Sequence, residues 1–353
     1  MAVGGLWIII GIFVDLAWHV RHDVETFLTW SHALLYTGLF FTFAAIALIS
    51  IRNAKMYGVS LLRAMPEGYE LAVPGVVLFF IAGAADATGH VLWGFEADFN
   101  ALLSPTHQLI GLSIVALLVG PIRSLLCAQQ QTRVSFASQL PGIIAVGSLL
   151  GLVHWGLNPF FGTDAESTYA PLAIHGFSPD ALTLNATLLS LQEAGLSSVV
   201  LQTVLTTAVV LYLVRALAVR PGGITLTLLL GNSFIAIAVA VSWTESIAAI
   251  VAITVAGLIG DFLLYRSLHR QTQSSLAENN RRLALILAPV VPFAYHAVLF
   301  ALIAIFLGGI WWNPIFLFGT LLYSAVFGFL LGLVITAKPS PAFKNENDYS
   351  TTR

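Results

Sequence analysis

Acidic residues and histidines recur at a fixed spacing near the ends of apolar segments in the first third of the chain. Asp15 and His19 stand four residues apart, and His32 follows after a short polar segment. Residues i and i+4 of a helix lie on one face with their Cβ atoms about 5–6 Å apart, a separation that one metal ion can bridge. One carboxylate and two imidazoles leave coordination positions open, so this set predicts a metal site for copper, iron or zinc.

The same skeleton occurs a second time further along the chain, where Asp86 and His90 repeat the first pair. His107 closes this copy after a loop slightly longer than the one in the first copy. In both copies a Ser stands one or three residues before the closing histidine. A polar pattern that occurs twice inside apolar sequence is hard to attribute to the capping of helix ends alone. Six residues are therefore predicted to be metal ligands: Asp15, His19, His32, Asp86, His90 and His107.

Each copy also contains a glutamate six residues after its first histidine. Glu25 and Glu96 are the candidate catalytic groups, which would transfer protons as general acids or bases. Two other roles stay open for them: that of a fourth metal ligand, and that of a partner that orients a ligating histidine.

Three further histidines, His154, His175 and His296, are additional candidate ligands. His154 ends the fifth apolar run, in the place of the first histidine of each copy, although Leu150 replaces the aspartate; packing at the membrane interface is the alternative role. His296 follows Pro292 in the ninth apolar run. A buried intramembrane histidine is a functional candidate, and the alternative is that it satisfies a backbone carbonyl that the proline frees.

These polar residues belong to a chain that is 58% hydrophobic and 9% charged, with a mean hydropathy of +0.89. About 25% of the residues in a soluble domain are charged, so a soluble protein is excluded. Runs long enough to cross about 30 Å of hydrocarbon occur ten times, which predicts an all-α integral membrane protein with about ten transmembrane helices. The predicted helices cover residues 3–20, 30–51, 71–92, 104–127, 138–158, 194–217, 222–242, 245–265, 283–307 and 313–336.

Basic residues predict the orientation of this bundle. Fourteen of the fifteen Lys and Arg residues fall on the side of the two termini, and Arg21 alone falls on the other side. Cytoplasmic loops are enriched in Lys and Arg, so both termini are predicted to be cytoplasmic, in the plasma membrane. The two polar hairpins then lie at the extracytoplasmic face.

The predicted organisation has three parts. Residues 1–135 form two tandem hairpins that carry the repeat, and residues 136–337 form the remaining transmembrane bundle with an irregular outer loop at 159–193. Residues 338–353 form a polar cytoplasmic tail. The single cysteine, Cys127, excludes an internal disulfide and a multi-cysteine metal site. The lipid bilayer is the predicted partner, other membrane subunits are a further candidate, and nucleic acid is not expected.

The first copy resembles a known metal-binding motif. Asp15-x3-His19-x12-His32 is similar to the motif of the C subunit of the copper membrane monooxygenases, the family of particulate methane and ammonia monooxygenases. The resemblance covers about eighteen residues and implies that these three side chains hold a metal, with copper the first to test. The second copy departs from the motif, with sixteen residues between its two histidines, and ten helices exceed the length expected of that subunit.

Three functions are consistent with these patterns. The leading hypothesis is a membrane metalloprotein with two-histidine-one-carboxylate sites, acting as a copper- or iron-dependent oxidase or monooxygenase on a lipophilic or small substrate. A metal-ion or small-molecule transporter is the first alternative, because internal repeats and intramembrane ionisable groups are typical of transporters. The second alternative is a structural or assembly subunit in which the Asp–His pairs only fasten the hairpins.

Overall fold

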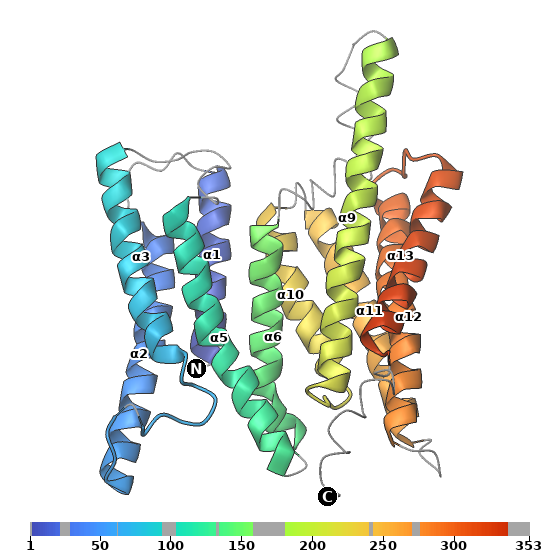
Figure 1. Ribbon diagram of the computed structural model, residues 1–353. Coiled ribbons are helices and arrows are strands. Elements are labelled where there is room, and N and C mark those ends of the chain that lie inside the picture. Colours follow the sequence, from blue (N-terminus) through green and yellow to red (C-terminus); the bar gives the residue numbers. More distant parts are fainter. Residues whose placement is uncertain are drawn as a thin grey trace, which may run out of the picture.

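The chain forms a bundle of long helices that run in alternating directions (Figure 1). The computed structural model describes residues 2–21, 29–61, 63–93, 104–131, 134–157, 181–239, 243–269 and 276–337. Ten helices occur in these residues: α1 (Ala2–Arg21), α2 (Trp30–Tyr57), α3 (Ala72–Trp93), α5 (Pro105–Gln131), α6 (Phe136–Gly156), α9 (Ala181–Arg215), α10 (Gly223–Val239), α11 (Trp243–His269), α12 (Leu276–Phe306) and α13 (Pro314–Ile335).

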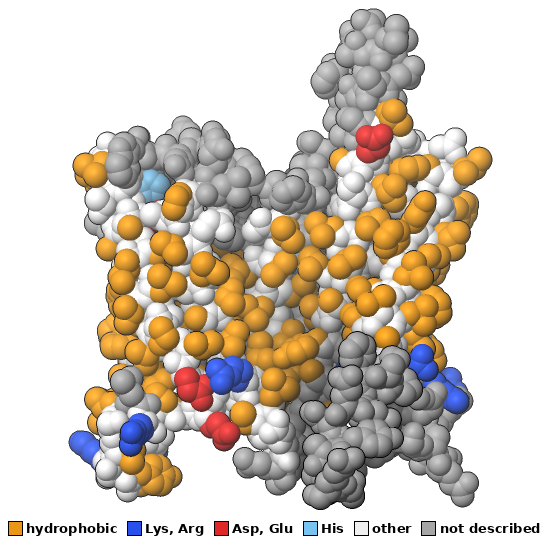
Figure 2. Space-filling model, viewed as in Figure 1, with side chains coloured by type: hydrophobic (Ala, Val, Ile, Leu, Met, Phe, Trp, Pro, Cys, Tyr) orange, Lys and Arg blue, Asp and Glu red, His pale blue; other side chains and the backbone are white. Residues whose placement is uncertain are grey.

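Eight of these helices are long and apolar enough to cross a membrane. The helices α1 and α10 contain shorter apolar stretches, Ala2–Asp15 and Gly223–Phe234. Apolar side chains cover the flank of the bundle between its two ends in the space-filling view (Figure 2). The prediction of an all-α, multi-pass membrane protein that contacts lipid is therefore confirmed.

The largest difference from the expected helix boundaries is in α9. This helix begins at Ala181, thirteen residues before its predicted start, so the predicted irregular loop at 159–193 ends earlier than expected. Residues 181–193 contain five leucines and two alanines and no Gly or Pro, and these strong helix formers outweigh the interspersed Thr and Asn residues. In Figure 1, α9 extends beyond the other helices.

Small residues bring the helices of the first hairpin into close contact. A Cβ atom added to Gly11 of α1 would lie 2.7 Å from the Cα atom of Leu35 in α2, and one added to Gly38 of α2 would lie 3.0 Å from the backbone nitrogen of Ile8. Lipid tails are as apolar as the helices, so close packing rather than the hydrophobic effect holds helices together in a bilayer. These glycines therefore determine how the end of α1 faces the start of α2.

The hairpins α1–α2 and α3–α5 lie side by side along one lateral edge of the bundle, next to α6 (Figure 1). We call the end at which α1 and α3 finish and α2 and α5 begin the site end. The Lys and Arg side chains visible in Figure 2 lie at the opposite end, and a histidine is visible near the site end.

Candidate functional site

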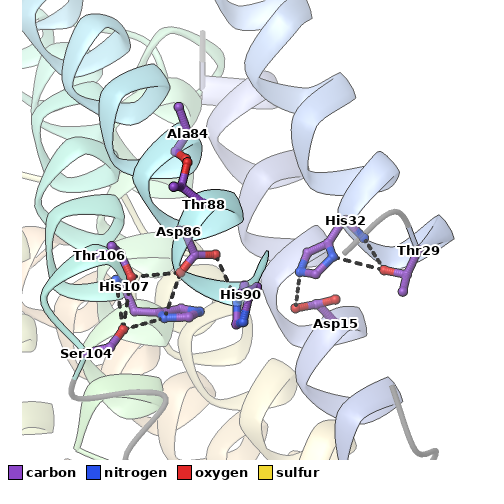
Figure 3. Close-up of polar contacts among 10 residues, drawn as sticks. All are labelled: Asp15, Thr29, His32, Ala84, Asp86, Thr88, His90, Ser104, Thr106 and His107. Carbon is purple, nitrogen blue, oxygen red and sulfur yellow. Dashed lines mark hydrogen bonds and ion pairs between the residues drawn. The ribbon is translucent and has the colours of Figure 1, made fainter. Parts of the chain in front are cut away.

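Asp86 is the centre of a polar cluster at the site end of the α3–α5 hairpin (Figure 3). Its side chain is only 7% exposed, and its two oxygens face different histidines. Oδ2 lies 3.4 Å from Nε2 of His90, one turn further along α3, and Oδ1 lies 3.4 Å from Nδ1 of His107 in the first turn of α5. The rings of the two histidines are 6.3 Å apart and nearly perpendicular. The fold thus brings both histidines of the second copy to the carboxylate of its aspartate.

The α1–α2 hairpin contains a corresponding contact. Oδ2 of Asp15 lies 3.4 Å from Nε2 of His32, and the two side chains are 19% and 13% exposed. His19 belongs to α1, but its side chain lies outside the described part of the structure, as do Glu25 and Glu96. The structure therefore shows the Asp–His pair of the first copy.

A hydroxyl group supports each aspartate in the same way. Ser31 donates a hydrogen bond to Oδ1 of Asp15 at 2.6 Å, and Thr106 donates one to Oδ1 of Asp86 at 2.7 Å. Both hydroxyls stand one residue before the closing histidine, so they occupy equivalent positions in the two copies. Such hydrogen bonds fix the orientation of a carboxylate next to a histidine, as outer-shell partners do in metal sites.

A second hydroxyl caps each returning helix and contacts the ring of its histidine. Oγ1 of Thr29 accepts from the backbone N–H of His32 at 3.3 Å and lies 3.1 Å from Nδ1 of its ring. Oγ of Ser104 accepts from the backbone N–H of His107 at 3.4 Å and lies 2.8 Å from Nδ1 of its ring. A Ser or Thr side chain that accepts from the third residue of a helix is a typical N-cap.

The two copies therefore share two hydroxyl positions before the closing histidine, whereas the sequence analysis matched only one Ser. Each returning helix begins with the pattern Ser/Thr-x-Ser/Thr-His, as Thr-Trp-Ser-His in the first copy and Ser-Pro-Thr-His in the second. Sequence reasoning missed Thr29 and Thr106 because it compared identical residues only. Treating Ser and Thr as equivalent hydrogen-bonding groups would have found both.

The Asp–His separations are compatible with metal ligation. Metal–nitrogen and metal–oxygen bonds of about 2.0–2.1 Å place two ligand atoms of a tetrahedral site about 3.3 Å apart, close to the 3.4 Å found in each Asp–His pair. In the part of the chain that the structure describes, however, no group of three or more His, Cys, Asp or Glu side chains is arranged to hold a metal ion. The donors are of the right type, and a metal would replace some of the hydrogen bonds that now hold them.

Asp261 shows how a purely structural aspartate is bound in this protein. It lies in α11 and accepts from the backbone N–H groups of Ile224 and Thr225 at 3.2 and 2.9 Å, and from the Thr225 hydroxyl at 2.5 Å. These partners are the otherwise unsatisfied donors in the first turn of α10, which need an acceptor in any helix. Asp15 and Asp86 instead face side-chain hydroxyls and imidazoles, so their surroundings are not explained by helix capping.

The other candidate histidines have backbone partners. Nδ1 of His154 lies 2.9 Å from the carbonyl oxygen of Gly231, and Nδ1 of His296 lies 2.8 Å from that of Pro292. Both side chains are buried. His175 lies outside the described residues.

His296 contacts a backbone carbonyl, as the alternative to metal ligation expects, but this carbonyl is not the one that Pro292 leaves without its helical donor. Pro292 lacks the N–H that would bind the carbonyl oxygen of Ala288, and the hydroxyl of Thr207 in α9 binds that oxygen instead, at 3.1 Å. The carbonyl that His296 contacts is that of Pro292, in the proline-containing stretch of α12, and the Ala288 carbonyl is satisfied from α9. Thr207 has this role because α9 packs against α12, which sequence spacing does not reveal.

Tyr36 lies beside the first polar cluster and reaches toward α3, which carries the second. It lies one turn after His32 in α2, and its ring packs edge to face on Phe79 of α3. A Cβ atom added to Gly83, three residues before Asp86, would lie 3.0 Å from the Tyr36 hydroxyl oxygen, so this hydroxyl reaches the α3 surface that carries the second cluster. Sequence reasoning did not single it out.

Comparison of the chain with protein-family models, with curated proteins and with solved structures gives no match. The short resemblance to the C subunit of the copper membrane monooxygenases therefore stays an untested prediction about Asp15, His19 and His32. The inferences about function below depend on the contacts of the two hairpins.

Proposed function

We propose that this protein is a membrane metalloprotein in which each of the two hairpins binds a metal ion. Asp86, His90 and His107 would be the ligands in the α3–α5 hairpin, and the first hairpin would use Asp15, His32 and the third member of its motif, His19. The observation that carries the proposal is the duplicated Asp–His contact of 3.4 Å, supported by the same hydroxyl in both hairpins. Two imidazoles and a carboxylate suit copper, with iron or zinc as alternatives.

The residues around each aspartate have distinct parts in this proposal. Ser31 and Thr106 hold the carboxylate oxygens in place, and Thr29 and Ser104 hold the closing imidazoles. A copper or iron ion bound there would supply an open position for oxygen chemistry, which makes an oxidase or monooxygenase the proposed enzyme class. The glutamate of each copy would exchange protons with the reacting groups.

The proposed sites lie at the extracytoplasmic face of the plasma membrane, with both termini in the cytoplasm. Support comes from the distribution of basic residues, which favours the cytoplasm for the end opposite the site end. Partner subunits of the copper monooxygenase type belong to the same proposal.

A structural role is the second candidate, and one observation favours it. Both aspartates already accept a short hydrogen bond from a hydroxyl, and no three described donors are arranged around one centre. In a structural subunit of this kind, the Asp–His contacts would fasten the end of one helix to the start of the next.

Metal analysis of the purified protein distinguishes the two roles. The protein is reconstituted with copper, iron or zinc in detergent, passed through a desalting column and analysed by mass spectrometry for bound metal. We expect one ion for each intact hairpin, loss of one ion in Asp15→Asn or Asp86→Asn, and loss of both in the double variant. His269→Ala is the matched control, because His269 is exposed and its ring contacts only the backbone carbonyl and the ring of Tyr265 among the described contacts. Metal content that the double variant does not change would refute the metal sites.

A further inference from the structure

A groove runs along α2 directly beside the first polar cluster. It has a volume of about 580 Å³ and is lined by seven residues of α2 and its N-cap: Thr29, Trp30, His32, Ala33, Tyr36, Thr37 and Phe40. These positions recur every three or four residues and so form one face of the helix. Pockets of about 300–1,000 Å³ are the usual size for small-molecule ligands.

The groove is polar at one end and apolar at the other. Thr29 and His32 stand at the site end, Tyr36 lies one turn further, and Phe40 lies another turn into the apolar span. At a rise of 1.5 Å per residue the lining extends about 16 Å along the helix. This gradient matches an elongated molecule with a hydrogen-bonding head at the membrane surface and a hydrocarbon body in the membrane.

The outer side of the groove faces the surroundings of the bundle. Trp30 and Phe40 are 55% and 62% exposed, and Ala33 and Thr37 are exposed as well. These residues belong to a helix that is long and apolar enough to span the membrane, so their exposed side chains contact lipid. A ligand dissolved in the bilayer would reach the groove without passing through water.

The polar end of the groove is also part of the candidate site. His32 lies 3.4 Å from Asp15, and Tyr36 reaches toward the α3 surface that carries Asp86. A head group bound between His32 and Tyr36 is therefore held next to both polar clusters.

The second hairpin lacks an equivalent of the Tyr36 side chain. When the closing histidines of the two copies are aligned, Gly111 of α5 corresponds to Tyr36 and Leu112 corresponds to Thr37. A Cβ atom added to Gly111 would meet nothing within 4 Å. The repeat thus provides a tyrosine hydroxyl beside the closing histidine in the first hairpin only, so the head-group contact belongs to that hairpin.

We propose that this groove binds a lipid-dissolved amphiphile, with its hydroxyl or carbonyl head at the Tyr36 hydroxyl, next to His32, and its hydrocarbon chain along Thr37 and Phe40. Its identification as the substrate rests on the proposed metalloenzyme function, whereas binding itself does not. The substrate class follows from the groove itself, whose polar end lies at the candidate metal site and whose apolar end lies in the bilayer.

Photolabelling in the full-length protein tests the proposal. The probe is a long-chain primary alcohol that carries a photoreactive diazirine, and the matched probe is the corresponding alkane. We expect the alcohol to label residues 29–40 preferentially and an excess of unlabelled alcohol to suppress that labelling. Thr37→Trp should fill the groove and reduce it severalfold, while Leu112→Trp, at the matching position of α5, should leave it unchanged.

Two further variants keep the test decisive. Tyr36→Phe should reduce the preference for alcohol over alkane by about fivefold, the factor that corresponds to one neutral hydrogen bond. Ala33→Leu fills less of the groove than Thr37→Trp and serves if the larger variant fails to fold, as judged by size-exclusion chromatography. Labelling spread over α2, α3 and α5 and unaffected by Thr37→Trp or Ala33→Leu would show annular lipid only and overturn the proposal. An alcohol preference unchanged in Tyr36→Phe would overturn it as well.

The labelling is repeated on protein treated with a chelator. Specific labelling with no bound metal in any preparation would support the groove and refute the proposed metal function. Bound metal together with unspecific labelling would support the metal function and refute the groove. The two proposals can therefore fail independently.

Discussion

The two hairpins share one polar skeleton but differ in which of its side chains is the more exposed. In the α3–α5 hairpin, Asp86 is 7% exposed and contacts two histidines, whereas Asp15 in the α1–α2 hairpin is 19% exposed and its described histidine contact is His32. The closing histidines also turn different nitrogens to the aspartate, Nε2 in His32 and Nδ1 in His107. The aspartate is thus the more buried in the second hairpin, whereas the closing histidine is the more buried in the first, 13% exposed in His32 against 25% in His107.

The surroundings of the closing histidines also differ between the hairpins. Trp30 and Tyr36 line a groove beside the first cluster, and the matching positions in the second hairpin are Pro105 and Gly111. The comparison shows that the hydroxyls and histidines are the common part of the two copies, while the neighbouring apolar residues distinguish them.

Removal of the aspartate should have the largest effect on stability, and the effect should differ between the copies. Asp86→Ala leaves Thr106 and two histidines without their common acceptor in a buried position, so we expect a loss of about 3 kcal/mol in the free energy of unfolding. Asp15→Ala, in a more exposed position, should cost about 1–2 kcal/mol. Chemical unfolding in detergent micelles measures both, and equal losses would mean that the difference in burial has no energetic consequence.

Removal of the supporting hydroxyl should lower metal affinity without abolishing binding. Thr106→Val and Ser31→Ala remove the hydrogen bonds to the carboxylate, and loss of such an outer-shell partner costs about 10–100-fold in metal affinity. Competition with a chromophoric chelator measures the change. If the hydroxyls serve only the packing of the hairpins, the affinity will stay constant while stability falls.

Removal of the capping hydroxyl should produce a smaller effect that is similar in the two copies. Thr29→Ala and Ser104→Ala each lose an N-cap, which costs about 1 kcal/mol. The shorter contact of Ser104 with its histidine ring, 2.8 Å against 3.1 Å, predicts that Ser104→Ala also perturbs the ring more. Nuclear magnetic resonance of ring-labelled histidine reports this, and a larger perturbation in Thr29→Ala would reverse the comparison.

The smallest effect is expected at the opposite end of the bundle, where Glu70 pairs with Arg123 at 3.2 Å. Hydrogen bonds from the backbone N–H groups of Glu70 and Gly68 lower the pKa of the Glu70 carboxyl, and Arg123 contributes further. A carboxyl whose pKa is lowered by folding stabilises the protein above its unfolded-state pKa and loses that contribution as the pH falls through its folded-state pKa. Glu70→Gln should therefore remove a small stabilisation at neutral pH, within about 0.5 kcal/mol for so exposed a pair, and should leave metal binding unchanged. If Glu70→Gln changes the metal content, the losses of metal seen in the hairpin variants cannot be assigned to the hairpins alone.

Sequence alone determined the class of the protein and the location of the two polar motifs. Each of the ten apolar runs coincides with a helix among the described residues, and eight of these helices have the apolar length that the bilayer requires of a span. The i to i+4 spacing of Asp86 and His90 predicted their contact, because it depends on local helix geometry alone. The prediction that the side chains bind metal is still to be tested.

Tertiary structure decided what lies around these motifs. The contact of Tyr36 with Gly83 and the α2 groove depend on how two hairpins pack together, and the capture of the Ala288 carbonyl by Thr207 depends on the packing of α9 against α12. Such contacts join residues far apart in the chain, and their geometry is set by interhelical packing of small and aromatic side chains, for which sequence spacing contains no rule. The polar skeleton was therefore readable from sequence, whereas the difference between the two copies was decided by the fold.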